Sequence, residues 1–248
     1  MQSERKYLYR RDAPVPEQHL LSDGNDWIIL STFIHIGKCA GTTIAKELQK
    51  RKIIHTNTVH CAQATYHDTY KYIISVRNPI RRFISAYNWQ HYCITRPTEA
   101  QCRGDHREEL RLFDFYKNIN GLAESIYDQN GNLDPKAYHF IQGKKEWGYR
   151  QIKEDINWYI GEFLKACPPE QIAAVVTMEN LKEDMKKIFD ITVTLHEHDN
   201  QNIYDTSLTE LGTKNLRKYL AKDYECLLKL KELGLITNAY YENFGSNP

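Results

Sequence analysis

The sequence predicts an α/β fold: a single domain in which helices flank a central parallel β-sheet. Short β-rich runs near residues 27–36, 71–77 and 172–177 are each followed by a segment with helical spacing. This alternation is typical of parallel sheets covered by helices. With 248 residues, the chain is long enough to bury one full core. We therefore expect one domain over residues 27–248, preceded by an irregular segment over 1–26.

The first predicted strand leads into a turn that suits an anion. Lys38 and Gly41 follow the apolar run, and a helix is predicted near 42–51. Glycine allows the backbone to approach a ligand closely, and the free N–H groups of a helix N-terminus attract negative charge. The residue order differs from the Walker A pattern, in which the lysine follows the last glycine. The segment therefore predicts an anion-binding loop of another kind.

A second motif follows the predicted strand over 71–77. Arg77 stands at the strand end, and Pro79 suits the first turn of a helix predicted over 79–92. Ser85 comes eight residues after Arg77, about two turns into that helix. An arginine fork matches phosphate oxygens in geometry and in charge. Because ligands bind outside the carboxyl ends of parallel strands, we expect both motifs at one edge of the sheet.

The other elements follow from periodicity and from residues that begin or end helices. Asp134 before Pro135 predicts a helix start. Asn120 followed by Gly121 predicts a turn, and Gly234 predicts the end of the last long helix. The remaining predicted segments are helices near 106–119, 150–166, 180–189 and 208–233, the last in two pieces, and short strands near 53–55 and 191–195.

The two motifs resemble the cofactor-binding elements of sulfotransferases that use 3′-phosphoadenosine 5′-phosphosulfate (PAPS). The order K-x-x-G-T-T after a strand is similar to their 5′-phosphosulfate loop, and R-N-P-x-x-R-x-x-S-x-Y is similar to their 3′-phosphate element. These motifs lie within residues 27–91, and Glu179-Asn180-Leu181 is similar to a later helix start in the same enzymes. The spacing between the lysine and the Gly-Thr pair looks most like the carbohydrate-modifying branch, such as the uronyl 2-O-sulfotransferases.

The resemblance implies a P-loop-like phosphosulfate-binding loop and assigns residues to the cofactor. The residues implied to bind the 5′-phosphosulfate are Lys38, Cys39, Ala40, Gly41, Thr42 and Thr43. Arg77 and Ser85 are implied to bind the 3′-phosphate. Enzymes of this family need no metal for the transfer, which releases 3′-phosphoadenosine 5′-phosphate (PAP). Histidines over 55–67 and 196–198 lack the spacing of zinc ligands, so no metal is expected.

The expected chemistry, an in-line sulfonate transfer, requires a cation and a base. The cation stabilises charge on the bridging oxygen, and the base accepts the proton of the acceptor hydroxyl. Lys38 is the expected cation. In the branch that this chain resembles, the base is a histidine between the first helix and the arginine strand. His60 fits that position best and His67 second, with His55 or Asp68 left open.

The acceptor is expected to be polar and to carry a hydroxyl, and a carbohydrate is the first choice. The predicted cofactor-binding core spans residues 27–92 and 172–233, and the segment over 93–150 is predicted to shape the acceptor site. A small polar natural product is an alternative acceptor. An atypical nucleotide-dependent kinase is the alternative function, although no apolar run ends in an aspartate that could hold Mg²⁺.

Composition narrows the expected partners and the compartment. A net charge of +1 gives no general attraction to nucleic acid or to a membrane surface. No stretch reaches the roughly 20 apolar residues of a membrane span, and the N-terminus has no apolar signal-peptide core. Six scattered cysteines fit free thiols in a reducing compartment. We therefore expect a cytoplasmic protein, with an excised lumenal domain left open, and the sequence predicts no oligomeric state.

Overall fold

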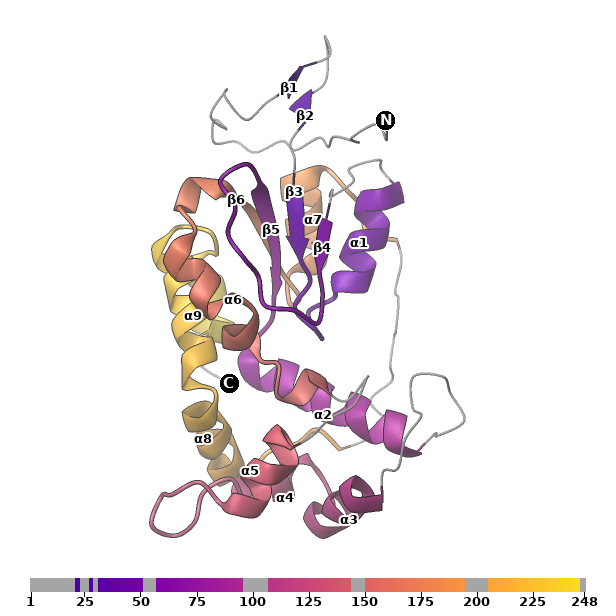
Figure 1. Cartoon of the computed structure of the whole chain (residues 1–248), viewed down its shortest axis with the longest axis vertical. Coiled ribbons are helices and arrows are strands. Elements are labelled where there is room, and N and C mark those ends of the chain that lie inside the picture. Colours follow the sequence, from indigo (N-terminus) through magenta and orange to yellow (C-terminus); the bar gives the residue numbers. More distant parts are fainter. Residues whose placement is uncertain are drawn as a thin grey trace.

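A four-stranded parallel sheet forms the centre of the computed structural model (Figure 1). The structure describes residues 21–22, 27–28, 31–50, 57–95, 107–143, 150–194 and 205–245. In the order in which they pair, the strands are β4 (Asn57–Val59), β3 (Ser31–Ile34), β5 (Lys71–Val76) and β6 (Ile172–Thr177). Ile34 pairs with Val59 on one side and with Ile74 on the other, so the strands end at a common carboxyl edge. The predicted fold class is confirmed.

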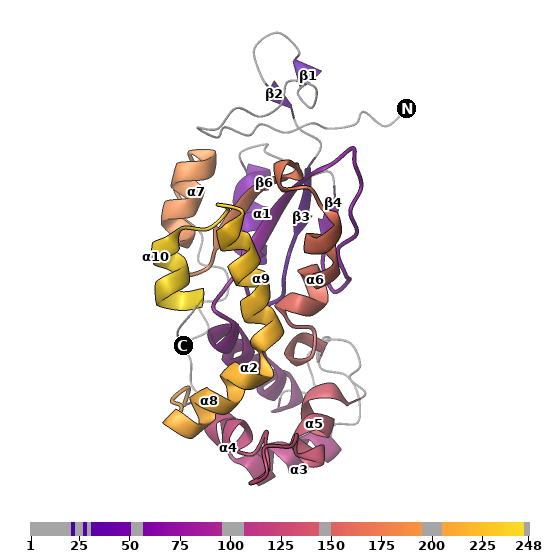
Figure 2. The same cartoon turned by 90° about the vertical axis from the view of Figure 1, so that its left-hand side faces the viewer.

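In the described part of the chain, four helices cover the two faces of this sheet. They are α1 (Gly41–Lys50) and α7 (Leu181–Phe189) on one face, and α6 (Ile156–Ala166) and α9 (Ala221–Glu232) on the other, nearer the viewer in Figure 2. Successive strand residues point to opposite faces. Phe33 and Ile73 therefore pack on α1 and α7, whereas Ile34 and Ile74 pack on α6 and α9. All four are buried, and each such side chain stabilises the fold by about 1.5–3 kcal/mol.

A second group of helices packs beyond the carboxyl edge of the sheet, below it in Figure 1. They are α2 (Pro79–Thr95), α3 (Arg107–Tyr116), α4 (Ile119–Glu124), α5 (Pro135–Gln142) and α8 (Glu210–Tyr219). Their apolar side chains form a separate core around Phe83, Tyr87 and Phe140. Only Arg77 and Asn78 separate β5 from α2, and this short link places the N-terminus of α2 at the sheet edge.

The residues predicted to begin and end helices give two confirmations and one correction. Asp134 caps α5, because its carboxylate accepts a hydrogen bond from a backbone N–H of the first turn at 2.8 Å. Gly234 follows α9 with a φ of 68°, a left-handed conformation that glycine adopts without strain. The turn predicted at Asn120 and Gly121 is wrong. The side chain of Asn118 caps α4 by accepting from the Gly121 N–H, and the helix runs through both residues.

The first strand is shorter than predicted. Among the described residues of the apolar run over 27–36, the four residues of β3 are those that pair within the central sheet. The strands of a separate antiparallel ladder are β1 (Leu21–Ser22) and β2 (Trp27–Ile28). The apolar pattern therefore spans two ladders, which periodicity alone cannot distinguish. The short strand predicted near 53–55 lies outside the described residues.

The strand predicted near 191–195 is not formed over its described part, 191–194. Ile191 and Val193 are buried and alternate as in a strand. However, the backbone N–H of Thr194 donates to the side chain of Glu47 on α1, at 3.3 Å, instead of to another strand. Further short elements are the 3-10 turns η3 (Arg150–Ile152) and η4 (Pro169–Gln171), the short helix α10 (Asn238–Tyr240) and the π-helical turn η5 (Tyr241–Gly245).

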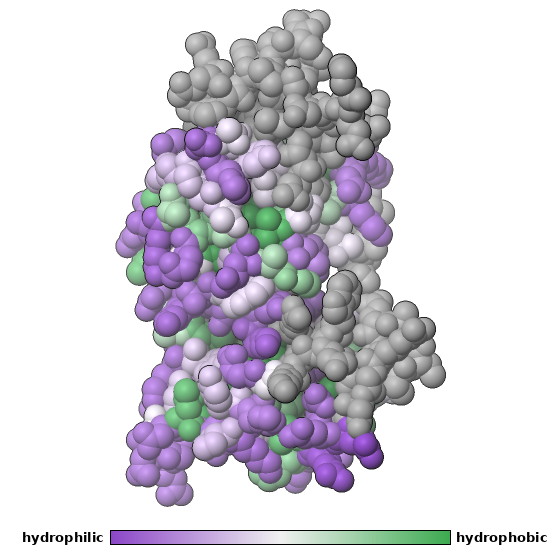
Figure 3. Space-filling view, in the orientation of Figure 1, coloured by the Kyte–Doolittle hydropathy of each residue, from purple (hydrophilic) through white to green (hydrophobic). Residues whose placement is uncertain are grey.

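The surface of the described residues is mainly hydrophilic on the face seen in Figure 1. Figure 3 shows this face, where hydrophobic side chains form only small separate areas. None of the helices in the described segments is both long enough and apolar enough to cross a bilayer. The apolar side chains instead lie mostly in the three cores between the sheet and its helices and among the helices beyond its carboxyl edge.

Candidate active site

The loop over residues 37–40 turns tightly between β3 and α1. Lys38 and Ala40 have φ angles of 69° and 59°, in the left-handed region that non-glycine residues seldom adopt. The Cys39 N–H donates to the carbonyl of Ile36 at 3.2 Å, which closes the turn. Burial raises the pKa of the Cys39 thiol to about 12, so this side chain anchors the loop in the core as a neutral group. Strained backbone of this kind is common at binding sites.

Gly41 opens α1 and leaves no room for a side chain. A Cβ on this residue would collide with the imidazole ring of His35. The N–H groups of Gly41, Thr42 and Thr43 belong to the first turn of α1, where the helix offers no carbonyl to accept from them. The start of α1 therefore brings hydrogen-bond donors and the positive end of the helix dipole to the carboxyl edge of the sheet.

Lys38 reaches from the loop to α2. Its Nζ lies 4.7 Å from the ring centroid of Trp89, whose π electrons attract the ammonium group. Burial, and to a lesser degree the positive charge of Arg77, lower the pKa of Lys38 to about 8. A negative charge next to Lys38 would raise this pKa again, because an opposite charge favours the ammonium form. Lys38 is thus a partly desolvated cation beside the first turn of α1.

Arg77 links the second motif to the loop. Its Nη1 donates a hydrogen bond to the carbonyl oxygen of Lys38 at 3.2 Å. Its Nε is buried and has no hydrogen-bond partner among the described residues. Burial lowers the pKa of Arg77, but a guanidinium group keeps its charge near neutral pH. A buried, charged donor without a partner is a group that a bound anion would satisfy.

Arg77 and Ser85 line the same pocket, which has a volume of about 460 Å³. The other residues that line it are Ile80, Arg81, Ile84, Thr206, Leu208 and Thr213. Two arginines and three hydroxyl side chains therefore face one space, with aliphatic side chains between them. The volume is in the range of pockets that bind small molecules. The two residues that the resemblance implies for one phosphate thus line one pocket.

His60 lies beside the loop through His35. The two imidazole rings stack with their centroids 4.0 Å apart, and Nδ1 of His60 lies 3.2 Å from the carbonyl oxygen of His35. The backbone N–H of His35 in turn donates to the carbonyl of Val59 at the end of β4. Because the His35 ring also abuts Gly41, only one ring separates His60 from the start of α1.

His67 lies at the amino edge of the sheet, where the parallel strands begin. Its backbone N–H donates to the Tyr72 hydroxyl at 2.6 Å, and its carbonyl accepts from the N–H of Tyr70, just before β5 begins. Asp68 lies in the same turn. The connection between β4 and β5 therefore starts beside the loop and ends at the amino edge, so its two histidines are separated. His55 and the segment over 195–204 lie outside the described residues.

A buried arginine supports the loop from behind. Arg82 is fully buried, and its Nη2 donates to the carbonyl oxygens of Gln151, at 2.8 Å, and of Glu154. The side chain of Gln151 approaches the loop, because a Cβ on Gly37 would meet its Cγ and Cδ at 3.5 Å. Arg82 thereby holds η3 and the start of α6 against the loop.

Two aspartates, Asp155, which is half-buried, and Asp223, which is 1% exposed, accompany Arg82. Asp155 caps α6 by accepting from a backbone N–H at 2.7 Å, and Asp223 on α9 accepts from the N–H of Asn157 at 2.8 Å. Burial raises the pKa of Asp155. Burial and the charge of Asp155 raise the pKa of Asp223 to about 8, and the charge of Arg82 opposes this shift. Asp223 therefore keeps its proton near neutral pH.

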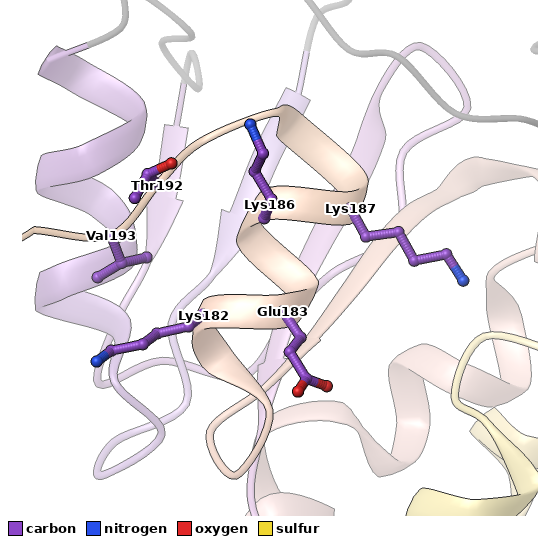
Figure 4. Close-up of a pocket in the computed structure, with 6 residues that line it drawn as sticks. All are labelled: Lys182, Glu183, Lys186, Lys187, Thr192 and Val193. Atoms are coloured by element: carbon purple, nitrogen blue, oxygen red, sulfur yellow. The ribbon is translucent and has the colours of Figure 1, made fainter.

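A second pocket, of about 530 Å³, lies beside α7 and carries no residue of the two motifs. Its lining residues are Lys182, Glu183, Lys186, Lys187, Thr192 and Val193. Figure 4 shows that the charged ends of its lysines point in different directions and do not converge on one point. Among the described residues, no three His, Cys, Asp or Glu side chains are grouped to hold a metal ion. The site described above therefore remains the stronger candidate.

Sequence reasoning gave no site role to three residues that lie at or behind the loop. His35 comes at the end of the first predicted strand, three residues before the loop lysine. Trp89 comes four residues after Ser85, a spacing that places both on one face of α2. Arg82 is the second arginine of the second motif. No local pattern in the sequence predicts that Arg82 is buried, because arginines are mostly exposed.

Comparison with known proteins gives one match. A family model described as "Sulfotransferase family" matches residues 31–245. No curated protein and no solved structure matches the chain. The matched span contains β3, the loop, the residues Arg77 and Ser85, and the whole described C-terminal part, and it covers most of the 248 residues.

Proposed function

Because the chain belongs to the sulfotransferase family, we propose that it transfers the sulfonate group of PAPS to a hydroxyl of a polar acceptor, with a carbohydrate as the favoured class. One observation carries this proposal: Arg77 lines a pocket with Ser85 and also donates to the carbonyl of Lys38. A single guanidinium thus joins a pocket suited to a 3′-phosphate and a loop suited to a 5′-phosphosulfate. The spacing of K-x-x-G-T-T supports a carbohydrate as the acceptor.

The residues of this site fit the cofactor that we propose. PAPS would supply the sulfonate group and leave as PAP. The N–H groups over 41–43 and the two threonine hydroxyls would hold its 5′-phosphosulfate, while Cys39 and Ala40 shape the turn. Arg77 and Ser85 would hold the 3′-phosphate. The buried Nε of Arg77, which has no partner among the described residues, is the donor that this phosphate would satisfy. We propose no metal ion for the reaction.

We assign Lys38 to the oxygen that bridges phosphorus and sulfur. Negative charge develops on this oxygen as its bond to sulfur breaks, and a nearby ammonium group stabilises that charge. The effect is larger in a partly buried position than in water, because the surrounding dielectric is lower. The ring of Trp89 holds the ammonium group on the α2 side of the loop.

His60 is our candidate for the base. A carbonyl oxygen only accepts hydrogen bonds, so the 3.2 Å contact with His35 requires the proton on Nδ1 of His60. Nε2 of the neutral ring then carries the lone pair and can take the proton of the acceptor hydroxyl. His67 is disfavoured because it lies at the amino edge of the sheet, away from Lys38.

The first test compares the binding of 3′,5′-ADP and 5′-ADP by calorimetry, with and without Mg²⁺. The two nucleotides have the same composition and differ only in where the second phosphate stands. We expect 3′,5′-ADP to bind without Mg²⁺ and about a hundredfold more tightly, because two charge-assisted hydrogen bonds from Arg77 and Ser85 depend on the 3′-phosphate. Equal affinities, or binding that requires Mg²⁺, would contradict the proposal and favour the kinase alternative.

Replacing His60 by alanine tests the base. The rate of sulfonate transfer should fall by about 10²–10⁴-fold, whereas the affinity for 3′,5′-ADP should stay within about twofold. The matched comparison is His67→Ala, which removes a histidine of the same connection at the other edge of the sheet and should change neither quantity. A normal rate in His60→Ala together with a large loss in His67→Ala would reverse the assignment.

A further inference from the structure

The segment after α9 lies against residues 77–81, which form the turn from β5 into the start of α2. The carbonyl oxygen of Phe244 accepts a hydrogen bond from Nδ2 of Asn78. The guanidinium group of Arg81 lies 5.0 Å from the ring centroid of Phe244. Because Arg77 and Arg81 both line the pocket of about 460 Å³, the segment over 238–245 packs directly behind this pocket.

Glu179 joins this C-terminal segment to the same turn. Its Oε1 accepts from the backbone N–H of Asn78 at 3.0 Å, and its Oε2 accepts from the Tyr240 hydroxyl at 2.8 Å. Asn78 is fully buried and Tyr240 is 2% exposed, so water screens these bonds little. Hydrogen bonds to a carboxylate are stronger than those between neutral groups. One side chain at the end of β6 therefore ties α10 to the start of α2.

Asn78 transmits this constraint to the arginines on either side. Its Oδ1 accepts from the N–H of Arg81 at 2.9 Å and so caps α2. Arg77 precedes it directly in the chain. The charge of Glu179 also acts on Arg77, in the direction that favours the charged guanidinium. A displacement of Asn78 would therefore move both arginines of the pocket.

We propose, on the basis of the function proposed above, that Glu179 and Tyr240 are positioning residues for the 3′-phosphate of the cofactor. Together they hold Asn78, and through it they hold Arg77 and Arg81 at the pocket. Neither Glu179 nor Tyr240 lines the pocket, so their effect on the cofactor is indirect. The C-terminal segment is thereby part of the anion site, although its residues lie far from both motifs in the sequence.

The hydrogen bonds that join Tyr240 to Asn78 through Glu179 are called the bridge here. The change Tyr240→Phe removes one hydroxyl group and tests this bridge. The measured quantity is the 3′-phosphate selectivity, defined as the dissociation constant of 5′-ADP divided by that of 3′,5′-ADP. We expect Tyr240→Phe to lower this selectivity about tenfold, the size of a lost hydrogen bond to a charged group. The affinity for 5′-ADP should not change, because this nucleotide lacks the phosphate that the bridge serves.

The matched control is Tyr72→Phe. Tyr72 is 1% exposed, and its hydroxyl accepts from the N–H of His67 at 2.6 Å, at the amino edge of the sheet. Its loss should lower the melting temperature about as much as Tyr240→Phe does and leave the selectivity unchanged. If Tyr240 had only a structural role, both variants would have a lower melting temperature and an unchanged 3′-phosphate selectivity.

Two changes at Glu179 separate its hydrogen bonds from its charge. Glu179→Gln and Glu179→Ala both remove the carboxylate, but the glutamine amide can still accept from Asn78 and donate to the oxygen of Tyr240. We expect the glutamine variant to keep the wild-type selectivity within about twofold and the alanine variant to lose about tenfold.

The outcomes distinguish this inference from the proposed function. If the wild type selects 3′,5′-ADP and both Tyr240→Phe and Glu179→Ala select it equally well, the positioning role is overturned and the proposed function stands. If the wild type shows no selectivity, both are overturned. Reduced selectivity in these two variants alone, with Tyr72→Phe and Glu179→Gln unaffected, supports the positioning role.

Discussion

Replacing Lys38 by alanine should lower the turnover number by about a hundred- to a thousandfold, the effect of removing one group that stabilises developing charge. Lys38 is the cation of the loop, and its Nζ lies 4.7 Å from the Trp89 ring centroid. The fold should survive, because the Lys38 side chain forms no ion pair among the described residues and the carbonyl that binds Arg77 belongs to the backbone. The measurement is the initial rate of PAP release from PAPS in the presence of a uronate-containing glycan.

The control for this change is Lys182→Ala. Lys182 is an exposed lysine on α7 that lines the other pocket, so its removal changes the net charge equally and leaves the loop intact. Its turnover number and melting temperature should match those of the wild type. Near-normal turnover in Lys38→Ala would remove Lys38 from the reaction. Lost turnover together with a lost thermal transition would instead show that the lysine is needed for folding.

Replacing Asp223 by asparagine should change how stability depends on pH. Burial and the charge of Asp155 raise the pKa of Asp223 from 3.8 to about 8. The folded state therefore keeps a proton that the unfolded chain releases above about pH 4. Stability must fall as the pH rises through this window and level off above about pH 8, with a slope of up to about 1.4 kcal/mol per pH unit for one group.

The amide of Asp223→Asn carries no charge at any pH in this range, and its oxygen can still accept from Asn157. We expect the variant to be as stable as the wild type near pH 5 and more stable at pH 8, as measured by urea unfolding. Asp128→Asn is the control, because Asp128 is an exposed loop residue whose pKa is lowered by hydrogen bonds to its carboxylate. Equal pH slopes in the wild type and in Asp223→Asn would contradict the prediction.

Local sequence patterns predicted much of the fold, including the loop and the helix on which the candidate site residues stand. The β-rich runs near 71–77 and 172–177, Pro79 at the start of α2, Asp134 before α5 and Gly234 after α9 all act over a few residues, and the structure confirms them. The strand predicted near 191–195 is wrong over its described part, because a side chain takes the place of the neighbouring strand as hydrogen-bond acceptor. Thr194 bonds to Glu47 instead of to a strand, and no short-range signal distinguishes the two cases.

The sequence by itself determined the fold class, the loop with Lys38, and the helix that carries Ser85, because periodicity, capping and turn chemistry depend on neighbours in the chain. Only the tertiary structure decided that Arg77 binds the carbonyl of Lys38, that His60 stacks on His35, and that Tyr240 reaches Glu179. These pairs lie 39, 25 and 61 residues apart. Contacts over such separations depend on how the sheet and its helices pack, and that packing is a property of the whole core.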